Sequence, residues 1–404
     1  MADTNADPPA RLLDLTRLAR RVGKPLTGID RVERAYLSRL LLDPVPLFGL
    51  VRTPLGYILT GEEGCADFLR RMDTGDWGTT DRLSRMRYGA EPVRARAESA
   101  LRRHAVARAV PQRLTSMLIK ALPKGVHYLN TGHSNLTDRV VGAIRAVPGA
   151  RVAVLLHDTI PLDLPQYQAD GMSDRFRTFL DHIYRDADLV ICNSHQTRSD
   201  LKRHLPDGAT LPNTVVAHLG VDVPEPGTAP TGPWTGQPYF VALGTIEPRK
   251  NHSMLLDLWE QEAPDAQLLI CGSRGWRNED IFSRLDAGIP GVHELSGVAD
   301  AGAFALLAES AGLLFPSHAE GFGLPPLEAA SLGVPVVCND LPSLRETLVD
   351  IPVYAEVSDR YLWSSTIRRL SNDHRAIRNR QEQPRRAFSP PTWAAHFKTV
   401  LTLI

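Results

Sequence analysis

The sequence has no net charge and no long apolar run. Its 46 lysines and arginines balance 46 aspartates and glutamates, so the overall charge does not indicate a nucleic-acid partner. No stretch approaches the roughly 18 apolar residues that a membrane-spanning helix needs. The opening residues 1–9 are polar and acidic, without the basic and apolar parts of a secretory signal. We therefore expect a cytoplasmic protein.

Cysteine is scarce as well. The four cysteines, Cys65, Cys192, Cys271 and Cys338, lie far apart and form no Cys-x-x-Cys pair. The last three stand inside apolar, strand-like runs, which is typical of buried thiols. This usage predicts reduced core cysteines rather than a disulfide framework.

What the sequence does contain is an alternation of strand and helix patterns. Hydrophobic residues make up 43% of its 404 residues and charged residues 23%, which is ordinary for a globular protein of two or three domains. Strands are predicted at residues 11–18, 46–52, 56–60, 126–130, 151–156, 188–192, 214–218, 239–244, 267–271, 292–295, 312–315 and 334–338, with helical patterns between several of them. This order predicts an α/β fold with mostly parallel, doubly wound sheets.

A run rich in proline and glycine, residues 224–238, interrupts the alternation. Such a composition forms no regular element and marks a domain boundary. We therefore expect an N-terminal domain over residues 1–223, a linker, and a C-terminal domain over residues 239–388. Two lobes on either side of a linker predict a deep cleft between them, the usual place for a small-molecule site.

The most informative stretch is residues 312–330. It begins as an apolar strand, breaks at Pro316 into a loop with two glycines, and resumes as a helix at Pro325. Ligands of α/β proteins bind beyond the carboxyl ends of the strands, and the N–H groups of a following helix attract anions. Glu320 stands in the loop and Glu328 in the helix. Their separation favours contacts with different parts of one extended ligand over the sharing of a proton.

The context of these two glutamates resembles a known signature. Pro-Ser-x-x-Glu-Gly-Phe-Gly-Leu-Pro-x-Leu-Glu-Ala, residues 316–329, is similar to that of the family-4 retaining glycosyltransferases, which have two Rossmann-like domains (the GT-B fold). Gly-Thr-x-Glu-Pro-Arg-Lys-Asn, residues 244–251, resembles the phosphate-binding element of the same family, as seen in mannosyltransferases of bacterial polysaccharide synthesis. The resemblance covers most of residues 127–404. It is weak before residue 127.

The resemblance implies roles for the donor-binding residues. Arg249 and Lys250 would bind the diphosphate of a nucleotide sugar, because cations at a strand end suit phosphate oxygens. Glu320 would face the donor sugar, and Glu328 would accept hydrogen bonds from the ribose. The N–H groups at Gly321, Phe322, Gly323 and Leu324 would complete the diphosphate site. The family further implies retention of configuration without a metal, and no cofactor beyond the nucleotide sugar.

Further residues are expected around the nucleotide base and at the end of the chain. Gly272, Gly297 and Val298 follow predicted strands, at turns where the family packs the base against main chain. The final helix, within residues 389–404, is expected to cross back to the N-terminal domain after a turn at Pro390 and Pro391.

The N-terminal half contributes candidates that are each individually less specific. Gly28, in Gly-Ile-x-Arg, resembles the loop that reaches the donor phosphates, although it can equally be a plain helix start. His157 and Asp158 end a strand in a His-Asp-x-x-Pro element that faces donor and acceptor in the family. A structural histidine and a helix-capping aspartate are the alternatives. His133 and Ser194 also follow strands, with structural roles as their alternatives.

Positive charge gathers in residues 81–124, where eleven lysines and arginines face three acids. Interleaved with alanine and larger apolar residues, they predict a basic amphipathic helix or helix pair. Such a segment suits an anionic membrane surface, or it is a solvated helix face with a buried stripe.

The predicted function is sugar transfer, with GDP-mannose as the leading donor and a glycan or lipid-linked glycan as the acceptor. UDP-sugar donors remain open, as does a synthase that uses UDP- or ADP-glucose. A sugar-nucleotide epimerase shares the two-lobed fold but would be expected to lack this spacing of glutamates. A catalytically inactive subunit is the alternative from a different class, against which the presence of Arg249, Lys250, Glu320 and Glu328 argues.

Overall fold

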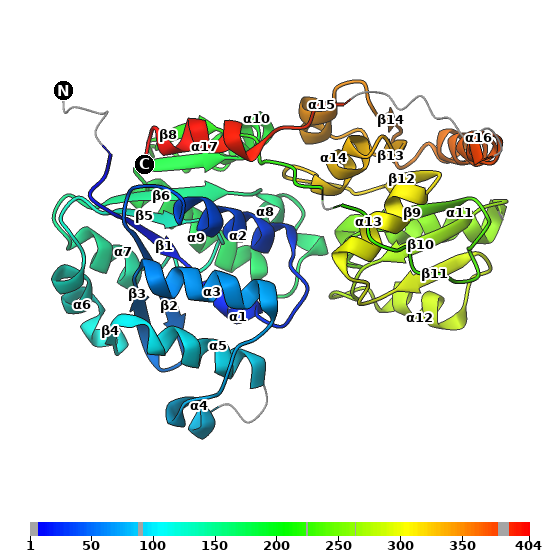
Figure 1. The fold of residues 1–404 in the computed structure, drawn as a ribbon. Coiled ribbons are helices and arrows are strands. Elements are labelled where there is room, and N and C mark those ends of the chain that lie inside the picture. The colour runs from blue at the N-terminus through cyan, green and yellow to red at the C-terminus, as the bar shows by residue number, and fades with distance from the viewer. Residues whose placement is uncertain (1–6, 88–91, 224, 263, 379–387) are drawn as a thin grey trace.

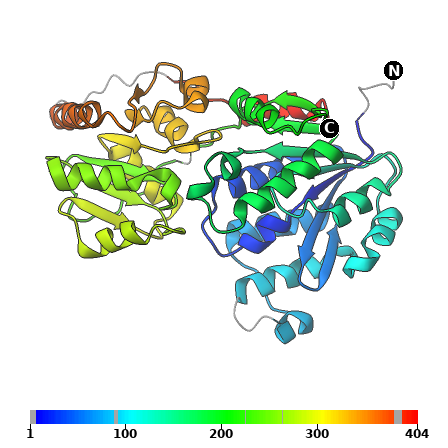
Figure 2. The same ribbon diagram turned by 180° about the vertical axis from the view of Figure 1, so that it is seen from behind.

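The computed structural model describes residues 7–87, 92–223, 225–262, 264–378 and 388–404. They form two lobes that lie side by side, each built on one sheet with helices packed around it (Figures 1 and 2). The predicted α/β fold with two doubly wound, mainly parallel sheets is confirmed.

The N-terminal lobe is built on an eight-stranded sheet. Its strands are β1 (Arg11–Asp14), β2 (Leu47–Thr53), β3 (Gly56–Thr60), β4 (Ala105–Ala109), β5 (His127–Asn130), β6 (Arg151–Leu156), β7 (Leu189–Cys192) and β8 (Asn213–Val216). They lie in the order β4-β3-β2-β1-β5-β6-β7-β8, parallel except for the two antiparallel pairs β2–β3 and β3–β4. Because both faces of the central strands are covered, β1 and β7 are buried along their whole length, as continuous apolar runs predict.

The helices of this lobe are α1 (Thr16–Arg21), α2 (Gly28–Leu40), α3 (Glu62–Thr74), α4 (Arg82–Arg87), α5 (Pro92–Arg103), η1 (Pro111–Arg113), α6 (Leu114–Ala121), α7 (Asp138–Arg145), α8 (Ile160–Asp163), η2 (Pro165–Tyr167), α9 (Met172–Asp186) and α10 (His195–Arg203). α2 begins at Gly28, with Thr27 as its N-cap. The carboxylate of Asp30 accepts a hydrogen bond from the N–H of Thr27 at 2.8 Å, which closes a capping box.

The first strand is shorter than its sequence suggests. The prediction of a strand over residues 11–18 is wrong beyond Asp14, since α1 begins at Thr16. The Asp14 carboxylate accepts a hydrogen bond from the N–H of Thr16 at 2.9 Å, and this local contact turns the chain out of the sheet.

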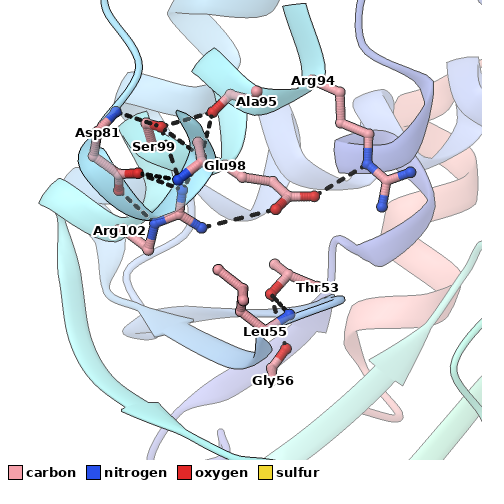
Figure 3. Close-up of polar contacts among 10 residues, drawn as sticks. Thr53, Leu55, Gly56, Asp81, Arg94, Ala95, Glu98, Ser99 and Arg102 are labelled. Atoms are coloured by element: carbon pink, nitrogen blue, oxygen red, sulfur yellow. Dashed lines mark hydrogen bonds and ion pairs between the residues drawn. The ribbon is translucent and has the colours of Figure 1, made fainter. Parts of the chain in front are cut away.

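The basic segment contains helices, but a strand that was not predicted lies between them. Within residues 81–124, outside the undescribed residues 88–91, the chain forms α4, α5, η1 and α6, but residues 105–109 form the edge strand β4, paired with β3. Arg102 is buried, and its Nε donates to Oδ2 of Asp81 at 2.6 Å. Its Nη1 lies 3.7 Å from Oε2 of Glu98 (Figure 3). The tertiary pairing of β4 with β3 overrides the local helical pattern there, so the predicted helix or helix pair is wrong for residues 105–109, whereas α5 and α6 are helical.

The C-terminal lobe has a six-stranded parallel sheet in the order β11-β10-β9-β12-β13-β14. The strands are β9 (Tyr239–Leu243), β10 (Gln267–Cys271), β11 (Val292–Leu295), β12 (Gly312–Phe315), β13 (Val336–Cys338) and β14 (Val353–Tyr354). The helices that follow β8 are η3 (Pro248–Lys250), α11 (His252–Glu262), α12 (Glu279–Ala287), α13 (Asp300–Glu309), α14 (Leu324–Ser331), α15 (Pro342–Leu348), α16 (Arg360–Arg378) and α17 (Trp393–Leu401). The last helix, red in Figure 1, lies with the N-terminal lobe.

Side-chain contacts attach α17 to that lobe. The Tyr36 hydroxyl bonds Nε2 of His396 at 2.8 Å, and Arg11 donates to the carbonyl of Ile404 at 3.2 Å. The described part of the predicted linker, residues 225–238, contains no helix or strand, and its Trp234 is buried beside His293. Pro224 and residues 379–387, at the edges of the predicted linker and C-terminal domain, lie outside the described residues.

All four cysteines are buried and free, as predicted. In the described part of the chain, no helix combines the length and apolar character needed to cross a bilayer.

Candidate active site at the junction of the lobes

The loop between β12 and α14 lies against the N-terminal lobe, and its glycines permit this approach. A Cβ atom on Gly321 would stand 2.0 Å from the carbonyl oxygen of His157 and 2.9 Å from Cβ of Asp158. Gly323 has φ of 83°, and a Cβ there would stand 2.4 Å from the Leu344 side chain. The motif therefore needs glycine at both positions for steric reasons, and it meets His157 and Asp158 directly.

Glu320, Arg249 and Lys250 form one compact ionic cluster. A single oxygen of Glu320, Oε1, lies 2.7 Å from Nη1 of Arg249 and 2.7 Å from Nζ of Lys250. Burial acts to raise the pKa of Glu320, but the two cations outweigh it and lower the pKa to about 2. The site thus combines a fixed carboxylate with two cations that are largely removed from solvent.

Two strand-end turns position this cluster. Arg249 donates from Nη2 to Glu247 at 2.6 Å and from Nη1 to the carbonyl of Ala319 at 2.7 Å. The N–H of His318 donates in turn to the carbonyl of Arg249 at 2.9 Å. The turns after β9 and β12, neighbouring strands of the sheet, are thereby joined at their carboxyl ends.

His157 stands at the end of β6 with its main chain and its ring both held. Nε2 donates to the carbonyl of Thr131 at 2.7 Å, which fixes the tautomer, and the His157 N–H donates to Nε2 of His133 at 3.0 Å. Burial lowers the pKa of His157 to about 4, so its ring is neutral near pH 7. His133 thus has a structural contact, with the main chain of His157.

Asp158 places a carboxyl group of the N-terminal lobe at this junction. Burial raises its pKa to about 6, against the opposing charge of Arg249. Its Oδ1 accepts a hydrogen bond from the N–H of Ile160 at 3.1 Å, at the first residue of α8. The capping contact expected of a helix-start aspartate is therefore present, and Asp158 also lies beside Gly321.

Gly28 and Glu328 belong to a second contact between the lobes, in which Gly28 lies beside Leu324 and Glu328 pairs with Arg31. A Cβ atom on Gly28 would lie 3.7 Å from the side chain of Leu324, at the start of α14. Nη1 of Arg31 lies 2.5 Å from Oε1 of Glu328, whose side chain is only 3% exposed. Burial raises the pKa of Glu328, and Arg31 opposes that rise.

Residues 229–383 match the sequence family described as glycosyl transferases group 1. This chain carries a glycosyltransferase group 1 domain. The match spans the C-terminal lobe, including the ionic cluster and the glycine loop. The arrangement of two lobes is that of the GT-B glycosyltransferases, in agreement with the expected fold.

The chain is also similar to two named relatives in sequence and to a solved structure in fold. The serotype-specific mannosyltransferase WbdA of Escherichia coli is 28% identical over 376 residues, 87% of this chain and 39% of the relative. O-antigen chain mannosyltransferase B of the same species is 36% identical over 132 residues, 31% of this chain and 34% of the relative. The structure of Anabaena HepE in complex with UDP-glucose, 16% identical, aligns with a TM-score of 0.56 over 97% of this chain and 94% of that one.

The chain therefore spans about two fifths of the length of WbdA. The similarity to HepE concerns the fold alone.

The predicted base-binding residues follow the adjacent strands β10 and β11. Gly272 comes after β10, where a Cβ atom would stand 1.9 Å from the carbonyl oxygen of Gly244. Gly297 has φ of 77° after β11, and Ser296 beside it donates to the carbonyl of Gly272 at 3.3 Å. Val298 packs toward the beginning of α13, where a Cβ atom on Gly302 would lie 3.2 Å from its side chain. The two turns thus lie together at the carboxyl ends of β10 and β11.

Three residues at the lobe junction have contacts that the sequence did not reveal. Ser194, for which a structural role was the alternative, caps α10 and also donates to the carbonyl of Gly321 at 3.1 Å. Glu346 on α15 accepts hydrogen bonds from the N–H groups of His195 and Gln196, at 2.7 and 3.2 Å. Arg31 is the final residue of the Gly-Ile-x-Arg pattern, and that pattern was the signal in the sequence that could have drawn attention to it.

Among the described residues, no group of three or more histidine, cysteine, aspartate or glutamate side chains is arranged to hold a metal ion.

Proposed function

We propose that this chain is a retaining glycosyltransferase that moves mannose from GDP-mannose to a glycan or lipid-linked glycan of a bacterial surface polysaccharide. The observation that carries the proposal is the contact of Glu320 with both Arg249 and Lys250 beside the glycine loop. The names of the relatives, a serotype-specific mannosyltransferase and an O-antigen chain mannosyltransferase, support the choice of sugar.

In the proposed mechanism the chain stabilises a departing diphosphate. The bond between the anomeric carbon and the diphosphate oxygen breaks as the acceptor hydroxyl attacks from the same face, and the acceptor proton passes to the departing phosphate oxygen. Arg249, Lys250 and the N–H groups of residues 321–324 stabilise the charge that develops on that oxygen. In this proposal the protein supplies the positive charge, and no divalent metal or other cofactor is required.

The remaining site residues bind and orient the donor. Glu320 faces the positive charge that develops on the sugar ring and bonds its hydroxyls, while Glu328 accepts hydrogen bonds from the ribose. His157, neutral and fixed in one tautomer, contacts the transferred sugar from the other lobe. Approach of the lobes excludes water and limits hydrolysis of the donor.

Nucleotide binding is the first test of this proposal. We expect GDP and GDP-mannose to raise the midpoint of thermal unfolding, since a ligand at 100 times its dissociation constant stabilises the folded state by about 2.7 kcal/mol. Differential scanning fluorimetry with GDP, UDP, ADP and their sugar conjugates measures this. A response to a uridine nucleotide alone would identify a UDP-sugar as the donor in place of GDP-mannose. No response to any nucleotide would favour an inactive subunit.

We also propose that the enzyme works at the inner face of the plasma membrane, through the exposed surface of β4 and α6. Val106, Val110 and Ile119 are 58, 50 and 47% exposed there, among the exposed cations Arg108 and Lys120. Apolar side chains among cations suit a surface of anionic lipid.

Sedimentation with vesicles tests this surface. We expect the protein to bind vesicles containing phosphatidylglycerol, and the double variant Val106→Asp, Arg108→Glu to bind them at least about tenfold more weakly. Tyr361→Asp, at a residue 81% exposed on α16, serves as the control and should bind like wild type. Equal binding of all three proteins would contradict the membrane contact.

A further inference from the structure

Arg31 connects three parts of the molecule through one guanidinium group. It projects from α2 in the N-terminal lobe, and its Nη1 lies 2.5 Å from Oε1 of Glu328 on α14 in the other lobe. Its Nη2 donates to the carbonyl of Asp222 at 3.4 Å, in the segment that leaves the N-terminal lobe after β8. The side chain of Arg31 is 29% exposed and that of Glu328 is 3% exposed. The contact is therefore placed at the boundary between the lobes and is mostly shielded from solvent.

Glu328 needs this cation more than an exposed glutamate would. A buried carboxylate is costly unless a positive charge or hydrogen bonds compensate it. Burial raises the pKa of Glu328, Arg31 acts to lower it, and the carboxylate of Asp300 acts to raise it. Without Arg31, the carboxylate would lose the cation that favours its ionised form. An ionised carboxylate has room for about four hydrogen-bond donors, so the contact with Arg31 leaves places for ligand hydroxyls.

We propose that Arg31 is a positioning residue for the nucleotide donor, which holds the Glu328 carboxylate in place for the two ribose hydroxyls. The inference rests on the proposed function, in which Glu328 binds the ribose. It adds that the ribose contact is completed by a residue of the opposite lobe, so that recognition of the ribose depends on the approach of the lobes. Gly28, three residues earlier and beside Leu324, keeps α2 close enough for this contact.

Ribose discrimination separates this role from a merely structural one. Isothermal titration calorimetry would compare GDP with 2′-deoxy-GDP on wild type, Arg31→Met and Arg34→Met. Arg34 lies on the same helix, but it forms an exposed ion pair with Asp73 of α3 instead of one with Glu328, so its variant is the matched control. If wild type responds only to uridine nucleotides, UDP and 2′-deoxy-UDP replace the pair.

We expect wild type and Arg34→Met to bind the ribonucleotide about tenfold or more tightly than its 2′-deoxy form, the usual loss for a hydrogen bond to a charged group. Arg31→Met should bind the ribonucleotide about tenfold more weakly and the 2′-deoxy form nearly unchanged, so that the discrimination disappears. Arg31→Lys, which restores a charge without the planar fork, should recover part of it. It also serves if the methionine variant does not fold.

The outcomes that overturn the inference are distinct from those that overturn the proposed function. If the Arg31 variants keep the wild-type preference for ribose, even at lower affinity, Arg31 has only a structural role. If they bind the ribonucleotide more tightly, Arg31 competes with the ribose instead of assisting it. If wild type binds no nucleotide, or does not distinguish ribose from deoxyribose, the proposed role of Glu328 fails, and the inference fails with it.

Discussion

Replacing Lys250 by methionine should reduce sugar transfer by about a hundredfold, because the variant keeps the bulk of the side chain and removes one of the two cations proposed to stabilise the leaving diphosphate. Nζ of Lys250 lies 2.7 Å from Glu320 and 4.4 Å from the centre of the Phe315 ring, so the charge is fixed in place. A cation held ready in a site with little water stabilises developing charge without reorganisation. The loss should therefore appear mainly in kcat.

Steady-state kinetics with the donor found in the binding experiments measure this effect. Lys202→Met provides the control, since Lys202 is an exposed lysine on α10. Arg249 still pairs with Glu320 in the Lys250 variant, so we expect the fold to be retained, with an unfolding midpoint close to that of wild type. Arg249→Met should lose at least as much activity, because Arg249 also binds Glu247 and the carbonyl of Ala319. Near wild-type transfer by both variants would refute the proposed diphosphate site.

Replacing Gly321 by alanine should also reduce transfer by about a hundredfold, through geometry alone. The added Cβ would stand 2.0 Å from the main-chain carbonyl of His157, so either the loop or the end of β6 must move. A displacement of about 1 Å in an active site costs on the order of a hundredfold in rate. The same displacement would disturb the hydrogen bond from Ser194 to the carbonyl of Gly321. We therefore expect a weaker contact between the lobes together with the lost activity.

A second glycine offers a matched control for this substitution. Gly142 lies in helix α7, and a Cβ atom there would meet nothing within 4 Å. Gly142→Ala should keep full activity and should raise the free energy of unfolding by about 0.4–1 kcal/mol, since alanine has fewer unfolded conformations. Kinetics and denaturant unfolding of both variants measure the contrast. Full activity of Gly321→Ala would show that the close approach to His157 is not required for transfer.

The fold could be predicted from the sequence wherever an element depends on its own residues. The strands at Gly56–Thr60 and Arg151–Leu156 were predicted with the bounds that the structure gives them. Such strands are apolar because both of their faces are covered by the rest of the protein. The apolar run therefore marks the strand in the sequence itself. Residues 105–109 gave no such signal, because β4 is an edge strand with alternating exposed side chains, and only its pairing with β3 makes it a strand.

The chemical groups that follow the carboxyl ends of the strands could be read from the sequence alone. Arg249, Lys250 and Glu320 could be identified because each lies in the turn that follows an apolar strand, within a pattern of glycine and proline that resembles the family motifs. Their roles in transfer stay predictions until the variants are measured. The predicted order of strands also placed the two turns in one lobe.

Which of these groups contact one another depends on the packing of the two lobes. The contacts of Arg31 with Glu328, of Ser194 with Gly321 and of Glu346 with the start of α10 all cross between the lobes. A sequence pattern encodes the periodicity of one element, whereas such contacts depend on how two separately folded sheets pack. For that reason the groups at the strand ends were visible in the sequence, and the pairing of buried charges across the lobe junction was not.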